Sequence, residues 1–204
     1  MNLSAMQWFF IKIIDSICQI VIFSQGEFAG MNLEGIQEEI SRCRRCALCE
    51  HRRLSVPGEG PCPAQVMLIG EAPGAQEDRQ GRPFVGRAGA VLDRALSQAG
   101  LRRDRLFITN VVKCRPPSNR RPLQGEIRAC RPYLEAQIEL VRPRVVCLLG
   151  NVPTQALLGM QGVTALHGQV IKGYLVTFHP AAVLRRADLE PLLISDLAKI
   201  GQLI

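Results

Sequence analysis

The chain has 204 residues, enough for one domain with a full hydrophobic core but too few for two independent cores to be expected. Its composition, 47% hydrophobic, 21% charged and 5% aromatic, is ordinary for a globular protein and excludes collagen-like, coiled-coil and wholly disordered chains. The formal net charge is +7, and 21 of the 25 basic residues are arginine, whose planar guanidinium group suits phosphate. The charge is compatible with a nucleic-acid partner and equally with a solvated basic surface.

The N-terminal part of the chain gives two separate signals. Residues 7–23 are apolar, but polar side chains interrupt them, so we do not expect a membrane span, which needs about 20 mostly apolar residues. After Met31 a helical pattern opens over residues 33–40. We interpret residues 1–30 as an extension that need not be native, with a docking helix as the alternative, and residues 31–204 as a single domain.

From Cys43 to Cys62 the chain is rich in Arg, Cys, Pro and Gly and has little periodicity, which is typical of a loop held by something other than a core. The eight cysteines come without a recognisable secretory signal, so metal ligation in the cytoplasm is favoured over disulfides. Cys18 and Cys147 lie in apolar runs and are expected to be small core residues.

Beyond the cysteine-rich loop, predicted strands alternate with predicted helices. We predict strands at 66–69, 106–112, 145–149 and 170–178, and the last of these segments could form one strand or two. We predict helices at 88–99, 124–141, 154–158 and 189–203, with Asp188 as a possible N-cap of the last helix. This alternation predicts an α/β fold, a three-layer αβα arrangement around a central, mostly parallel four-stranded sheet.

In such folds ligands bind where loops leave the carboxyl ends of the strands, which selects the loops 70–89, 110–124 and 179–188. The first loop combines glycines with three carboxylates and a phenyl ring, although a long acidic solvated loop is the alternative. The second begins at Asn110, whose amide can donate and accept at a base edge, although such an Asn is often a turn residue. The third begins at His179, which by itself carries little information.

Four motifs in these loops together indicate a family. They are Gly-Glu-Ala-Pro-Gly-x-x-Glu-Asp (70–78), Gly-Arg-Pro-Phe-Val-Gly-x-Ala-Gly (81–89), Ile-Thr-Asn-Val-Val-Lys-Cys-Arg-Pro-Pro (108–117) and His-Pro-Ala-Ala-Val-Leu-Arg (179–185). From about Ile36 to the C-terminus, the chain resembles the family 4 uracil-DNA glycosylases, the bacterial and archaeal class that carries an iron–sulfur cluster. Residues 1–30 have no counterpart in that pattern.

The resemblance implies a monofunctional hydrolase of base excision repair, which cleaves the N-glycosidic bond of deoxyuridine in DNA, releases uracil and leaves an abasic site. Such an enzyme must hold a flipped nucleotide and stabilise the negative charge that develops on the leaving base. The resemblance implies that Phe84 stacks on the uracil ring, that Asn110 pairs with its polar edge, and that His179 donates to, or lies near, its developing charge.

The same resemblance assigns supporting roles within the first loop. Main-chain groups of Gly70 and Ala72 would line the pocket, and Glu71 would help to place the water. Glu77 would exclude the methyl group of thymine, and Asp78 would be a supporting residue. The best-known uracil glycosylase family has an aspartate where this chain has Ala72, so no side-chain base is expected at that position.

In the third loop the resemblance implies that Leu184 fills the gap left by the flipped base and that Arg185 contacts phosphate. An apolar residue that only covers the end of the sheet is the alternative for Leu184. The implied partner is uracil-containing DNA, with no membrane, and the protein is expected to be a cytoplasmic monomer.

The family pattern implies a [4Fe–4S] cluster held by Cys43, Cys46, Cys114 and Cys130. Thiolate quartets suit iron–sulfur clusters and zinc alike. A rival quartet is local and replaces the two distant cysteines with Cys49 and Cys62. We favour the first set because the loop between Cys114 and Cys130 is rich in Arg and Pro and has too little apolar content to order itself. The cluster is expected to brace arginine-rich loops facing DNA.

Two other functions remain open from the sequence. The chain could be a non-catalytic iron–sulfur or zinc protein that binds nucleic acid, or an electron carrier that uses the local quartet. Release of uracil from an oligonucleotide separates the first hypothesis from both of these.

Overall fold

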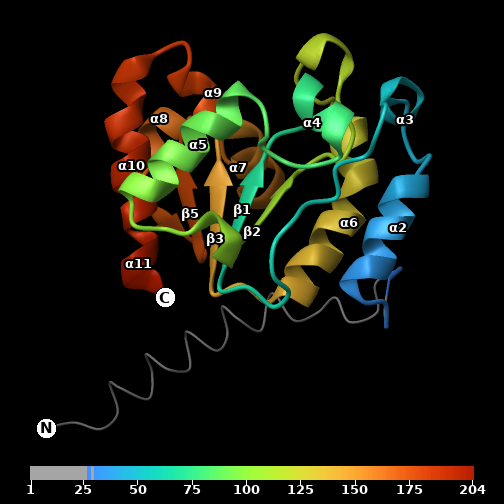
Figure 1. Ribbon diagram of the computed structural model, residues 1–204, viewed down its shortest axis with the longest axis horizontal. Coiled ribbons are helices and arrows are strands. Elements are labelled where there is room, and N and C mark those ends of the chain that lie inside the picture. The colour runs from blue at the N-terminus through green and yellow to red at the C-terminus, as the bar shows by residue number, and fades with distance from the viewer. Residues whose placement is uncertain (1–26, 29) are drawn as a thin grey trace, which may run out of the picture. The chain divides into compact units, whose positions relative to one another are not determined.

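The computed structural model of the chain describes residues 27, 28 and 30–204 (Figure 1). The apolar stretch at 7–23 and Cys18 lie outside the described residues. The chain divides into one unit that ends at Met31 and a second from Asn32 to Ile204. The sheet, the core and the candidate site all belong to the second unit.

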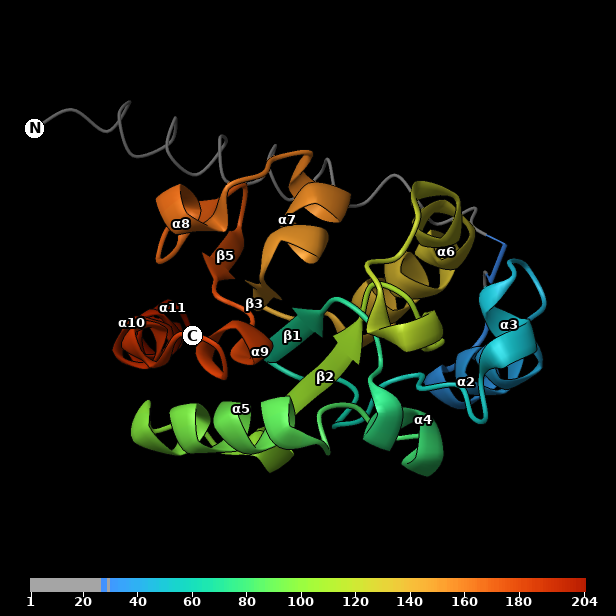
Figure 2. The same ribbon diagram turned by 90° about the horizontal axis from the view of Figure 1, so that it is seen from above.

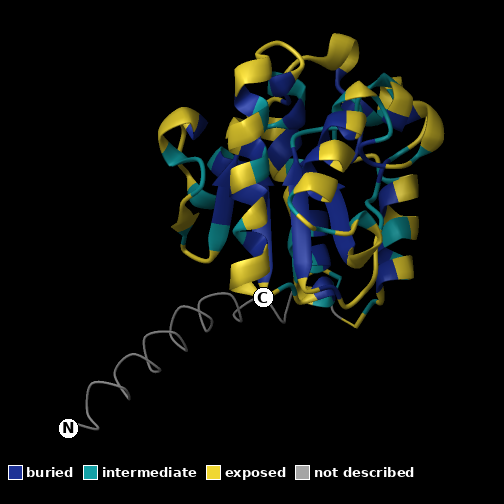
Figure 3. Cartoon of the chain, turned by 60° about the vertical axis from the view of Figure 1, so that its left-hand side comes forward, coloured by how far each residue is buried: buried dark blue, intermediate teal, exposed yellow. Residues whose placement is uncertain are grey.

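The centre of this unit is a five-stranded sheet with the order β2-β1-β3-β5-β4. Its strands are β1 (Val66–Gly70), β2 (Leu106–Asn110), β3 (Val145–Leu149), β4 (Val170–Ile171) and β5 (Tyr174–Thr177). The first three and β5 are mutually parallel, as predicted, and every residue of β1, β2 and β3 is buried, which is typical of a parallel sheet covered on both faces (Figure 3).

The prediction of four strands was one strand short. The predicted segment 170–178 folds into two strands, of which β4 is a short antiparallel edge strand. Lys172 and Gly173, with φ angles of 51° and 83°, form the tight turn between them. Positive φ angles at two consecutive turn residues match the twist of a hairpin, so the chain turns back here instead of continuing as one strand.

Helices cover both faces of the sheet, which confirms the three-layer αβα prediction. Figure 2 shows α5 (Arg87–Gln98) and α10 (Glu190–Ala198) on one side, and α6 (Gln124–Val141) and α7 (Asn151–Leu158) on the other. The predicted helix at 33–40 is α2 (Leu33–Arg42), which begins at Asn32, whose Oδ1 accepts from the Gly35 amide at 2.9 Å. α2 packs against α6 through a buried apolar face.

Short helices lie inside segments expected to be loops. They are α3 (Leu48–His51), α4 (Ala75–Gln80), α8 (Val163–Leu166) and α9 (Pro180–Val183). Each has at most six residues, too few for a hydrophobic period to appear in the sequence. α4 ends at Gly81, which has a left-handed φ of 70°.

The predicted last helix at 189–203 is divided into α10 and α11 (Ile200–Leu203). The expectation that Asp188 caps it was wrong, because Leu189 is the N-cap residue of α10. Asp188 lies in a preceding 3₁₀ turn and pairs with Arg186 at 2.6 Å. Among the described residues, no helix is long and apolar enough to cross a membrane.

Candidate active site

The three predicted loops meet at one edge of the sheet. Gly70 and Asn110 are register partners at the ends of β1 and β2, and His179 follows β5 by two residues. Because the paired strands run parallel, their carboxyl ends lie together at the edge that carries α4 and α9 (Figure 1). A pocket of about 350 Å³ opens there. It is lined by Glu71, Ala72, Pro73, Gly74, Glu77, Phe84, Ala88, Asn110, Pro116, Asn119, Arg120, His179, Ala181, Ala182 and Arg185.

The side chains of Phe84, Asn110 and His179 converge in this pocket. The Phe84 and His179 rings lie 5.7 Å apart between centroids. A Cβ added to Gly70 would overlap both Asn110 Oδ1 and the edge of the Phe84 ring, so Gly70 leaves the space in which these two groups approach each other. Three segments far apart in the sequence therefore surround one small space.

Two buried polar atoms in the described residues have no hydrogen-bond partner, and both are in this pocket: Asn110 Oδ1 and His179 Nε2. Leaving a buried polar atom unpaired costs about 1–3 kcal/mol, so such atoms are uncommon in native proteins. Their coincidence in one pocket indicates that they are arranged for the polar edge of a ligand.

Burial and a main-chain contact leave the His179 ring neutral, with one N–H group available as a donor. Its Nδ1 accepts from the Ala181 amide at 3.1 Å, so in the neutral ring Nε2 carries the proton. Burial, with a smaller effect from Arg185, lowers the pKa of His179 to about 4. At neutral pH the ring is uncharged, and Nε2 presents one N–H group to the pocket.

The main chain of Asn110 is held from behind by Lys113, which sequence reasoning did not single out. Lys113 is 1% exposed, and its Nζ donates to the Asn110 carbonyl at 2.8 Å, to Gln137 Oε1 at 2.6 Å and to Thr109 Oγ1 at 2.7 Å. Burial lowers the pKa of the Lys113 amine to about 7, and its three hydrogen bonds make it a rigid anchor for the end of β2. The only sequence signal for it was a lysine directly after an apolar strand.

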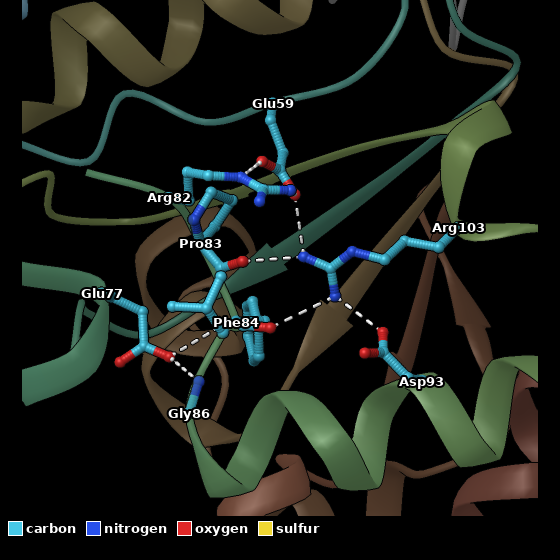
Figure 4. A network of polar contacts seen from close by, with 9 residues as sticks. Glu59, Glu77, Arg82, Pro83, Phe84, Gly86, Asp93 and Arg103 are labelled. Carbon is cyan, nitrogen blue, oxygen red and sulfur yellow. Dashed lines mark hydrogen bonds and ion pairs between the residues drawn. The ribbon is translucent and has the colours of Figure 1, made fainter. Parts of the chain in front are cut away.

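The carboxylate of Glu77 supports the loop that carries Phe84. One oxygen accepts from the amides of Val85 at 2.9 Å and Gly86 at 2.8 Å (Figure 4). The other accepts from the Gly74 amide at 3.1 Å. Both oxygens are therefore engaged by main-chain donors, while the side chain also lines the pocket. Asp78 is buried and accepts from the Arg53 amide at 2.9 Å, which is a supporting contact.

Glu71 and Ala72 lie on the wall of the pocket next to Asn110. Burial raises the pKa of the Glu71 carboxyl, and the nearby positive charges of Arg121 and Arg185 partly offset the effect. A carboxylate whose pKa is raised is a better proton acceptor than an ordinary one. Two carboxylates line the pocket. Glu77 is held by main-chain donors, whereas the Glu71 side chain has no hydrogen-bond partner among residues 30–204.

The rim of the pocket is basic and carries one apolar tip. Arg185 and Arg120 line the pocket, and Leu184, at the end of α9, is 41% exposed. Arg120 is oriented by two bonds to the buried Glu126, at 2.6 and 2.9 Å. The contribution of Pro116 and Asn119 was missed, because their loop has no hydrophobic period and its place depends on Asn119 having a φ of 54°.

A second cavity, separate from this pocket, is lined by five cysteines: Cys43, Cys46, Cys49, Cys114 and Cys130. Cys43 acts electrostatically on the thiols of Cys46, Cys114 and Cys130. The favoured quartet is thus brought together from α6 and two loops. Cys62 is exposed and lies elsewhere, with its Sγ donating to the Leu140 carbonyl at 3.4 Å, so the rival local quartet is not assembled. Cys147 is buried in β3, as expected.

The donors around this cavity fit an iron–sulfur cluster. Thiolates ligate such clusters, and hydrogen bonds to their sulfurs tune them. Here Arg52 donates to Cys114 Sγ at 3.0 Å, and the Lys113 amide donates to Cys130 Sγ at 3.3 Å. In the described part of the chain, no three His, Cys, Asp or Glu side chains already have metal-binding geometry. The cavity fits a cluster because its ligand atoms are thiol sulfurs and because the cysteines line one space.

Comparison with known proteins identifies the family of this chain. The pattern of the Uracil DNA glycosylase superfamily matches residues 57–198. The chain is 45% identical to the type-4 uracil-DNA glycosylase of Pyrobaculum aerophilum, over 82% of this chain and 92% of that protein. It is 43% identical to the type-4 enzyme of Sulfurisphaera tokodaii, over 84% of each chain, and 38% identical to that of Thermotoga maritima, over 84% and 94%. The chain therefore belongs to the type-4 uracil-DNA glycosylases, within the uracil DNA glycosylase superfamily.

Proposed function

We propose that this chain is a uracil-DNA glycosylase, which hydrolyses the N-glycosidic bond of deoxyuridine in DNA, releases free uracil and leaves an abasic site. The observation that carries the proposal is the pair of unpartnered buried atoms, Asn110 Oδ1 and His179 Nε2, beside the Phe84 ring. An acceptor, a donor and an aromatic face are what a uracil ring needs from a pocket.

Asn110 and Phe84 recognise the flipped base. Asn110 Oδ1 accepts from the N3–H of uracil, and its amide group donates to O4, a pairing that cytosine, which has no N3–H and carries an amino group at C4, cannot make. Phe84 stacks on the ring. Glu77, buried on the wall of the same pocket, leaves no room for the methyl group that distinguishes thymine.

His179 and Glu71 act on the two charges that develop during cleavage. The bond between C1′ and N1 breaks with its electron pair on uracil, and His179 Nε2–H donates to O2, where the negative charge is shared. The sugar becomes cationic, and water adds to C1′. Glu71, with a pKa raised by burial, orients this water and receives the proton that it loses.

The basic rim holds the DNA around the extruded nucleotide. Arg185 contacts phosphate, and the exposed Leu184 enters the gap that the uracil leaves in the base stack. We propose that the enzyme acts as a cytoplasmic monomer, with residues 31–204 as its single domain and residues 1–30 as an extension.

We further propose that Cys43, Cys46, Cys114 and Cys130 hold a [4Fe–4S] cluster. Their shared cavity and the bonds from Arg52 and Lys113 to two of the sulfurs support this set. When bound, the cluster ties the two cysteine loops to α6. Lys113 precedes Cys114 and donates to the Asn110 carbonyl. Ligation of Cys114 would therefore also hold in place Asn110, whose side chain recognises the base.

The test is release of uracil. The purified protein is incubated with an oligonucleotide that contains one uracil, and abasic sites are revealed by alkaline strand cleavage. Asn110→Ala and His179→Ala should each suppress cleavage, while His51→Ala, a control at an exposed histidine outside the pocket, should not. A wild-type protein that binds the oligonucleotide without releasing uracil would instead support a non-catalytic binding module.

A further inference from the structure

The residue that presents the aromatic wall of the pocket has a strained main chain. Phe84 has a φ of 51°, a left-handed conformation that costs a bulky residue about 1–3 kcal/mol and persists only where the surroundings enforce it. Its carbonyl lies against α5 so closely that a Cβ added to Gly89 would overlap it. The direction of the Phe84 ring therefore depends on whatever fixes the two peptide groups that flank it.

One guanidinium fixes the carbonyl side of this segment. Arg103 donates to the Pro83 carbonyl at 2.7 Å and to the Phe84 carbonyl at 3.3 Å (Figure 4). The same two terminal nitrogens also donate to two carboxylates, Glu59 at 3.0 Å and Asp93 at 2.8 Å. The two terminal nitrogens of the guanidinium serve all four acceptors, whereas an ammonium group has only three N–H donors.

The acceptors of Arg103 are anchored to the core of the fold. Glu59 is bonded to Ile108 of β2 in both directions, at 3.0 and 2.8 Å, and Asp93 lies on α5. Burial would raise the pKa of Glu59, but the bonds from Arg82 and Arg103 outweigh it and hold the pKa below its ordinary value. Glu59 is therefore charged at neutral pH, and the network joins β2, α5 and the Phe84 segment.

We propose that Arg103 is a positioning residue for substrate recognition, which sets the orientation of the Phe84 ring against the flipped pyrimidine through the carbonyls of residues 83 and 84. This inference rests on the proposed glycosylase function. Arg103 does not line the pocket, so it acts only through Phe84. Stacking holds the base before and during cleavage alike, so its loss should raise KM more than it lowers kcat.

The test compares Arg103→Met with Arg102→Met in steady-state uracil release. Arg102 is the neighbouring arginine, exposed and paired only with the exposed Asp104, and serves as the matched control. Arg103→Met should raise KM about tenfold, within the range known for base stacking on an aromatic side chain, with kcat changed less. Arg103→Lys should be intermediate, and Arg102→Met should match the wild type.

Free uracil as a competitive inhibitor gives a second readout, because it binds without DNA contacts. Its inhibition constant should rise with Arg103→Met by a factor similar to that for KM. The decisive comparison uses the Phe84→Ala background, in which Arg103→Met should add no further increase in KM. A mainly structural role would instead give additive effects in this double-mutant cycle and a fall in both kcat and melting temperature.

Unchanged KM and unchanged uracil inhibition in Arg103→Met would overturn the inference while the wild type still releases uracil. Additive effects in the Phe84→Ala background would overturn it as well. A wild-type protein that releases no uracil would overturn the proposed function, and this inference with it, so the two failures are distinguishable.

Discussion

Replacing His179 by alanine removes one neutral hydrogen-bond donor from an enclosed pocket. Nε2 is buried, has no partner in the protein and carries the proton, because Nδ1 accepts from the Ala181 amide. A donor of this kind, aimed at an atom that gains negative charge, is worth about 100- to 1000-fold in rate. We therefore expect His179→Ala to lower kcat by that factor in single-turnover release of uracil at pH 7.

The structure also predicts how His179 affects stability as the pH changes. Its pKa is about 4 in the folded protein, against 6.5 ordinarily, a difference that corresponds to about 3 kcal/mol. Between these pH values the unfolded chain binds the proton and the folded chain does not, so stability falls as the pH drops from about 7 to 4. The alanine variant lacks this loss, and its stability relative to the wild type should rise by up to about 3 kcal/mol over that window.

The assay is denaturant unfolding of the two proteins at several pH values, together with the single-turnover rates. A stability difference that stays constant from pH 7 to pH 4 would mean that the imidazole is not kept neutral by burial, and the reasoning would fail. A kcat reduced less than about tenfold would show that Nε2–H does not meet the developing charge.

Three further outcomes follow from the site. Because burial raises the pKa of Glu71, kcat of the wild type should fall as the pH drops through that raised pKa. Glu71→Gln should have a lower kcat that no longer falls in this pH range. If kcat of the variant still falls there, another group is responsible for the pH dependence. Cys114→Ala should lose the visible absorption of an iron–sulfur protein and Cys62→Ala should keep it, as recorded in absorption spectra of the purified proteins. Leu184→Gln should lower kcat/KM on duplex DNA about tenfold and leave single-stranded DNA nearly unaffected, since only a duplex has a gap to fill; equal losses on both would argue against a wedge.

The local features of the fold were predictable from the sequence. β3 and α6 have the predicted bounds, Val145–Leu149 and Gln124–Val141, because a run of buried strand residues and a helical period are properties of neighbouring residues. The turn at Lys172 and Gly173 escaped prediction, since it depends on a φ angle that lysine seldom adopts. The motifs likewise named Phe84, Asn110 and His179, because all three lie in loops that follow predicted strands and the family resemblance assigned their roles.

Only the tertiary structure decided which of these residues meet. The parallel register of β1 and β2 sets Gly70 beside Asn110. The parallel pairing of β1 with β3 and of β3 with β5 brings His179 to the same edge, within reach of Phe84. In the same way, the packing of α2 and its following loop near α6 places Cys130 with Cys43 and leaves Cys62 apart. The four contacts of Arg103 had no signal in the sequence at all. Sequence periodicity reports on neighbours a few residues apart, whereas these contacts depend on how the sheet and helices pack, which no local pattern records.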